Sequence, residues 1–133
     1  GVQMEVGPVA TEFEQEDIGT TLAKCQRYYQ KWLSDTVSDS VMTAAAISDV
    51  AFIGDYFLKT SMRSVPTMGT SGTYKARLKT NDRAITGQPS INRATTENVQ
   101  IFATIATDNN ESGFAGFLKT DDDDAFLEFI AEL

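Results

Sequence analysis

Hydrophobic residues recur at helical spacing in one segment, residues 17–33. Intervals of three and four residues place them on one face of an α-helix, while most positions between them are polar or basic. The apolar positions are Ile18, Leu22, Cys25, Tyr29 and Trp32. The pattern predicts a helix over residues 17–33 that packs this face against a sheet, with Cys25 buried and unreactive.

The chain before this helix has two parts. Residues 1–7 alternate between apolar and polar side chains, which predicts a short N-terminal strand. The rest of residues 1–16 forms an acidic lead-in, and acidic side chains favour the positive N-terminal end of a helix. Asp17 or Thr20 is the expected N-cap.

Most of the remaining chain alternates with a period of two, which is typical of half-buried strands. The segments that favour a strand are 44–47, 55–63, 74–78, 99–105, 114–118 and 125–131, with Phe57 as an exception to the alternation. A turn is expected over residues 69–72. We therefore predict a single mainly β domain over residues 1–133, with strands in 44–133. Its expected fold is a jelly-roll-like β-sandwich carrying one short N-terminal α-helix packed on it.

Polar segments at 34–40, 80–98 and 108–113 are expected to be loops, of which 80–98 is the longest. Long loops on a compact domain often carry function. A glycan site would combine an aromatic platform with hydrogen-bonding side chains, and a solvated loop is the alternative for each residue. The candidate ligand-binding residues are Tyr74, Asn81, Asp82, Arg83, Asn92, Arg93, Asp108, Asn109 and Asn110.

The charge balance argues against two classes of partner. The chain has 11 basic and 19 acidic residues and a net charge of -8, so phosphate backbones and anionic membrane surfaces would repel it. No apolar run approaches the length of a membrane span. We expect neither nucleic-acid binding nor membrane insertion.

Residue types also limit the chemistry. The chain has no histidine, so it cannot hold a Ser-His-Asp triad, and zinc would lack its usual ligands. The run Asp121 to Asp124 lacks the alternate spacing of a calcium loop, because consecutive side chains in an extended segment point to opposite sides. A solvated hairpin loop is favoured there, with calcium as the alternative. We expect no catalytic residues, no metal, no cofactor and no enzymatic activity.

One run of residues resembles a known family. Phe13-Glu14, Gly19, Leu22 and Cys25-Gln26-Arg27-Tyr28-Tyr29 are similar in order to a segment of tailed-bacteriophage tail-fibre and related virion proteins. The stretch Val2 to Gly7 with Ala10-Thr11, the pair Met62-Arg63 before Pro66-Thr67, and Ala131-Glu132-Leu133 are also similar. The chain departs from the family at Glu12, Gln15 and Glu16, and residues 35–53 and 80–98 have no counterpart. The structural motif comprises Leu22, Cys25, Gln26, Arg27, Tyr28, Tyr29 and Trp32.

The resemblance implies the C-terminal, distal domain of a tail fibre or similar virion appendage. Such domains are mainly β and usually homotrimeric, and they bind a host surface polysaccharide or protein without a reaction. Apolar residues on both strand faces, such as Phe102 and Phe126, also favour homotrimers because they need cover. The alternative is a structural virion protein, a capsid decoration or fibre-assembly subunit that binds other virion proteins. A third reading is the non-catalytic module of a polysaccharide-degrading tailspike.

Overall fold

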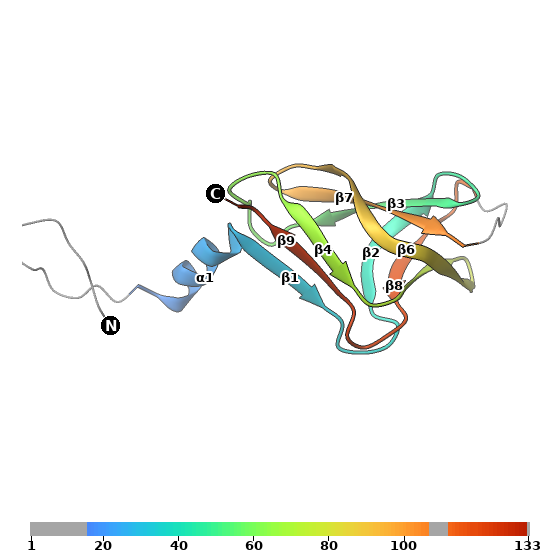
Figure 1. Ribbon diagram of the computed structural model, residues 1–133, viewed down its shortest axis with the longest axis horizontal. Coiled ribbons are helices and arrows are strands. Elements are labelled where there is room, and N and C mark those ends of the chain that lie inside the picture. The colour runs from blue at the N-terminus through green and yellow to red at the C-terminus, as the bar shows by residue number, and fades with distance from the viewer. Residues whose placement is uncertain (1–15, 107–111, 133) are drawn as a thin grey trace, which may run out of the picture.

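The computed structural model describes residues 16–106 and 112–132, and strands make up 55% of these residues (Figure 1). This confirms the prediction of a mainly β chain with one short helix. The elements in order are α1 (Ile18–Gln26), β1 (Tyr29–Leu33), β2 (Ser40–Ala46), β3 (Ala51–Phe57), β4 (Thr67–Ser71), β5 (Tyr74–Leu78), β6 (Asn81–Ala94), β7 (Asn98–Ile105), β8 (Ala115–Thr120) and β9 (Phe126–Ile130).

Six strands close into a barrel in the order β2-β3-β7-β6-β5-β8, and the neighbouring strands are antiparallel. The alternation predicted for β7 is confirmed, because Val99, Ile101, Ala103 and Ile105 are all buried. Their neighbours on the same strand point outward and are half-buried or exposed. Because alternate side chains of a strand point to the same side, one set fills the interior of the barrel and the other set lies on its outer surface.

The other three strands form a separate sheet in the order β1-β9-β4. Leu127 and Phe129 of the middle strand are fully buried and belong to the same core cluster as the barrel residues. Phe129 stacks on Tyr56 of β3 with 5.0 Å between the ring centroids. The inner face of this sheet thus packs against the barrel, and the two share one core.

The predicted helix is wrong over its second half. α1 ends at Gln26, and residues 29–33 form β1 instead. β1 pairs with β9 along its whole length, from Tyr29 opposite Ile130 to Leu33 opposite Phe126. The N-cap prediction is confirmed at Asp17, whose carboxylate accepts a hydrogen bond from the backbone N–H of Thr20 at 3.2 Å.

The expected packing of the helix is also wrong. α1 lies wholly within the described residues, and none of its side chains is buried. Cys25 is exposed, which corrects the prediction of a buried, inert thiol. In the ribbon, α1 extends from the end of β1 away from the barrel (Figure 1). Among the residues that the structure describes, no core covers the apolar stripe of this helix.

Three boundaries differ from the sequence expectations. The strand predicted over 55–63 is β3, which begins earlier and ends at Phe57. The turn predicted over 69–72 belongs mostly to β4, and only Gly72 after it takes the left-handed backbone, with φ +92°. Strand expectations for 44–47, 74–78, 114–118 and 125–131 are confirmed in outline by β2, β5, β8 and β9.

The long polar segment 80–98 is not a loop. Residues 81–94 form β6, which bonds to β5 on one side and β7 on the other. Few of its side chains are buried, and its register to β7 shifts twice. Backbone pairing rather than burial makes this segment a strand, and hydrophobic periodicity does not report such pairing. The N-terminal strand predicted over 1–7 lies outside the described residues.

Candidate functional site

Tyr74 cannot serve as the aromatic platform of a glycan site. Its side chain is only 4% exposed and belongs to the core. Its hydroxyl donates to the backbone carbonyl of Phe126 at 2.7 Å, and the carbonyl of Ser71 lies at 3.0 Å. Burial raises the pKa of Tyr74 to about 12. The residue is structural, which corrects its assignment as a ligand contact.

The polar candidates on β6 do not form one site. Asn81, Asp82 and Arg83 begin the strand, whereas Asn92 and Arg93 lie near its other end, about 30 Å away for an extended strand. The remaining candidates, Asp108, Asn109 and Asn110, lie outside the described residues. A single small ligand therefore cannot contact both groups on β6.

Asp82 is engaged in ion pairs. Its carboxylate lies 3.0 Å from the Arg77 guanidinium and 3.7 Å from the Lys75 ammonium. Burial acts to raise the pKa of Asp82, but the hydrogen bond from Arg77 and the charges of Arg77, Lys75 and Lys119 hold it below its usual value. This charge cluster on the outside of the barrel explains the polar start of β6 without a ligand.

Three hollows that share Asp55 lie on the outer face of the barrel. The first has a volume of about 170 Å³, the second about 490 Å³ and the third about 340 Å³. Phe57 and Thr43 line the second and third hollows, and Gln100 lines the first and second. We call the combined surface the Asp55 groove, and we define it by Thr43, Ile53, Asp55, Phe57, Arg93 and Gln100.

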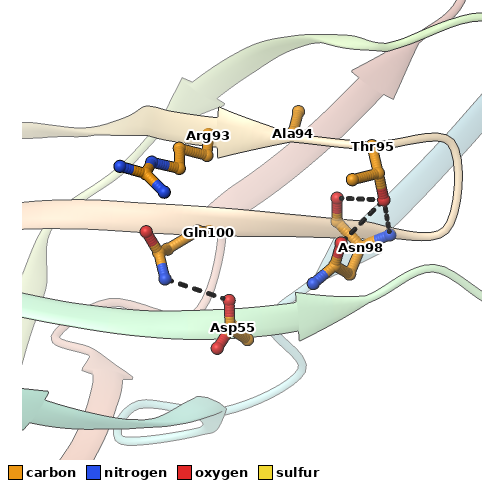
Figure 2. Close-up of a pocket in the computed structure, with 6 residues that line it drawn as sticks. All are labelled: Asp55, Arg93, Ala94, Thr95, Asn98 and Gln100. Carbon is orange, nitrogen blue, oxygen red and sulfur yellow. Dashed lines mark hydrogen bonds between the residues drawn. The ribbon is translucent and has the colours of Figure 1, made fainter.

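The polar wall of the Asp55 groove comes from three adjacent strands. Asp55 of β3 lies opposite Gln100 of β7, which lies opposite Arg93 of β6. The Gln100 amide nitrogen donates to Asp55 at 3.4 Å, and its oxygen accepts from Asn92 at 2.7 Å. Figure 2 shows Arg93, Gln100 and Asp55 in this order across the strands. One guanidinium, one amide and one carboxylate therefore stand side by side.

The apolar part of the groove adjoins this wall. Phe57, at the end of β3, is 75% exposed. Along the sheet, Ile53 of β3 lies between Ala45 of β2 and Phe102 of β7. The arrangement offers an exposed aromatic ring beside hydrogen-bond donors and acceptors, as binding pockets commonly do. Phe57 broke the alternation of its segment, and that exception was the available sequence signal for this site.

The described residues give no sign of a metal site. Within 16–106 and 112–132, no group of three or more His, Cys, Asp or Glu side chains lies close enough to hold an ion. In the four-aspartate turn, Asp121 pairs with Lys75 at 2.8 Å, whereas Asp122 accepts from the hydroxyl of Thr73 at 2.8 Å. These two carboxylates thus have separate partners.

No helix in the described part of the chain is long and apolar enough to cross a membrane. Comparisons with protein-family models, curated proteins and solved structures find no significant match to this chain.

Proposed function

We propose that this protein is a non-catalytic receptor-binding domain of a virion appendage, such as the distal part of a phage tail fibre, and that it binds a bacterial surface polysaccharide in the Asp55 groove. The observation that carries the proposal is Phe57, 75% exposed at the edge of a row of polar side chains. The virion location and the homotrimer are supported by the resemblance of residues 25–29 to tail-fibre proteins.

The groove has the chemistry that a sugar requires. The C–H face of a pyranose ring is apolar and can lie flat on the Phe57 ring, which water would otherwise cover. Its hydroxyl groups both donate and accept hydrogen bonds. Asp55 supplies acceptors, Arg93 supplies donors, and Gln100 supplies both. A neutral or mixed-charge polysaccharide fits this set better than a strongly anionic one, because Asp55 would repel an anion.

The barrel gives the groove a firm base. Ala46 of β2 and Phe52 of β3, which alternate with outward residues of these strands, are buried in the core. Outer residues on such strands can change with little effect on the core. The sheet β1-β9-β4 packed on the barrel also supports the finer assignment of a jelly-roll-like sandwich, which we propose for this fold.

The test is binding of the full chain to an array of bacterial capsular and O-antigen polysaccharides. We expect binding to a subset of them, and we expect Phe57→Ala to weaken it about tenfold or more, which corresponds to about 1.4 kcal/mol. Phe114→Ala is the matched control, because Phe114 is also exposed but lies against Lys79. Unchanged binding by Phe57→Ala would exclude the Asp55 groove as the site.

A structural role in the virion is the second candidate. It is favoured by the apolar residues around the groove, because Ile53 and Phe102 are only half-buried and Phe117 is 46% exposed. A surface of this kind is what a protein partner would cover. A cryo-EM map of the virion separates the candidates: a receptor-binding domain stands at the tip of an appendage, whereas a decoration or assembly subunit contacts other virion proteins over this face.

A further inference from the structure

The first hollow of the Asp55 groove carries one charge of each sign. Of the six residues that line it, Asp55 and Arg93 are charged, and both are exposed. Its volume of about 170 Å³ is small, since pockets that enclose a whole small ligand measure about 300–1,000 Å³. The hollow therefore holds only part of a ligand, and the rest must lie along the groove. The other residues that line it are Ala94, Thr95, Asn98 and Gln100.

The two charges of this hollow do not neutralise each other. Asp55 and Arg93 both lie opposite Gln100, on the two strands that flank it. Neighbouring antiparallel residues have Cα atoms about 5 Å apart, so the Cα atoms of the two charged residues are about 10 Å apart. Among the described residues, neither forms an ion pair. In Figure 2 the Gln100 side chain lies between them, so both charges are available to a ligand.

Hydrogen bonds within the protein hold the walls of the hollow in place. The Gln100 amide oxygen accepts from Asn92 at 2.7 Å, and its nitrogen therefore faces Asp55. At the end of the hollow, the Thr95 hydroxyl donates to the side-chain oxygen of Asn98 at 2.7 Å and accepts from its backbone N–H at 3.1 Å. These bonds form without a ligand, which reduces the ordering that binding requires.

This pair of charges selects by the charge pattern of the ligand. A ligand with charges of one sign is attracted by Asp55 or by Arg93 and repelled by the other, so the two effects largely cancel. A ligand that carries an ammonium group and a carboxylate gains from both. Hydrogen bonds between charged groups are also stronger than those between neutral groups, and guanidinium and carboxylate can pair through two parallel bonds.

The rest of the groove indicates which kind of molecule carries these charges. The second hollow shares Asp55 and Gln100 with the first and is also lined by Phe57, which is 75% exposed. A molecule that leaves the first hollow past Asp55 therefore reaches an aromatic ring. A free amino acid carries both charges on one carbon atom and does not extend that far. Linked sugars do, and their apolar C–H faces suit the ring.

We propose that the Asp55 groove selects polysaccharides that carry both signs of charge on neighbouring sugars. Asp55 binds the free ammonium group of an amino sugar, and Arg93 binds the carboxylate of an adjacent acidic sugar. Gln100 donates to and accepts from the hydroxyl groups between them. This inference rests on the proposed function and narrows its ligand from bacterial polysaccharides in general to those of mixed charge.

The test is titration calorimetry of the full chain with three tetrasaccharides, in mildly acidic buffer so that free amines are protonated. De-N-acetylated hyaluronan carries ammonium and carboxylate groups on alternate sugars. Native hyaluronan carries the carboxylates but has acetylated amines, and chitosan carries the ammonium groups alone. We expect de-N-acetylated hyaluronan to bind about tenfold more tightly than either of the others, because each of them lacks one charged hydrogen bond.

Variants that remove one charge assign the two roles. Asp55→Asn should abolish the preference for the free amine, so that both forms of hyaluronan bind alike. Arg93→Gln should abolish the preference for the carboxylate, so that de-N-acetylated hyaluronan and chitosan bind alike. Asp124→Asn and Arg27→Gln are the matched controls, because they remove the same charges from exposed positions outside the groove and should leave both preferences unchanged. Thermal melting would verify that all four variants fold.

Three results would overturn the inference: equal binding of the three probes, binding of none of them, or preferences that persist in both Asp55→Asn and Arg93→Gln. Its failure is distinguishable from that of the proposed function. If neutral polysaccharides on the array bind and Phe57→Ala weakens them, the groove binds sugars without selecting their charge, and only this inference is wrong. If Phe57→Ala changes no binding at all, the Asp55 groove is not the site and both proposals are wrong.

Discussion

A buried amide on β1 anchors residues 58–66, the segment between β3 and β4 that has no strand structure. Gln30 is 6% exposed. Its side-chain nitrogen donates to the backbone carbonyls of Thr60 at 2.7 Å and Gln26 at 3.0 Å, and its oxygen accepts from the backbone N–H of Lys59 at 2.8 Å. These bonds attach both the end of α1 and the segment after β3 to one side chain.

Gln30→Leu should remove all three bonds while keeping a side chain of similar length. Each backbone group left unpaired in a buried setting costs about 1–3 kcal/mol. The three contacts are part-buried, and the carbonyl of Gln26 ends a helix that water can reach, so the lower part of that range applies. We expect the free energy of unfolding to fall by about 3 kcal/mol.

The assay is urea unfolding at fixed protein concentration, followed by the fluorescence of Trp32, the only tryptophan. Gln88→Leu is the matched control, because Gln88 is exposed and its amide donates to the carbonyl of Gly72 at 2.8 Å. Its loss should cost about 0.5 kcal/mol or less, as surface changes usually do. If the two variants lose the same stability, burial of the Gln30 amide is not what holds the segment.

Two further predictions concern a glycine of the barrel and the pH dependence of stability. Gly116→Ala should cost about 3 kcal/mol in the same assay, because its Cβ would lie 2.0 Å from the carbonyl oxygen of Arg77. Gly87→Ala meets no atom within 4 Å and should cost only about 1 kcal/mol for its φ of +74°, so equal costs would contradict the clash. The backbone N–H of Asp35 and the hydroxyl and N–H of Thr36 hold the pKa of Asp39 below its usual value. This carboxylate therefore stabilises the fold above about pH 4 and loses that effect as pH falls through its folded pKa. Unfolding curves of Asp39→Asn should therefore depend less on pH in the acid range, and an unchanged pH dependence would refute this role.

The local patterns in the sequence predicted the elements whose two faces differ. β7 and β5 alternate between buried and outward positions, and this alternation is visible in the residues alone. The helix start was equally local, because Asp17 caps a backbone N–H only three residues away. Each of these features shows in neighbouring residues, either as an alternation of side-chain types or as a capping residue beside the first turn, and a sequence pattern records both directly.

The end of the helix and the polar strand were decided by distant pairing. Tyr29 and Trp32 continue the helical spacing, yet β9, about a hundred residues later in the chain, takes residues 29–33 into a sheet. β6 buries few of its side chains fully but satisfies its backbone through β5 and β7. Hydrogen bonds between strands do not depend on side-chain type, so hydrophobic patterning could not find them.

The same division applies to the candidate site. Composition alone, with no histidine and a net charge of -8, led to the predictions of no enzymatic activity and no nucleic-acid binding, and both stay predictions. Only the closed barrel brought Asp55, Gln100 and Arg93 into one row, because β3, β7 and β6 are neighbours in space but not all consecutive in the chain. It also turned Tyr74 inward and Phe57 outward. Which side of a strand faces the core is a property of the assembled sheet, and for residues of mixed character no local pattern determines it.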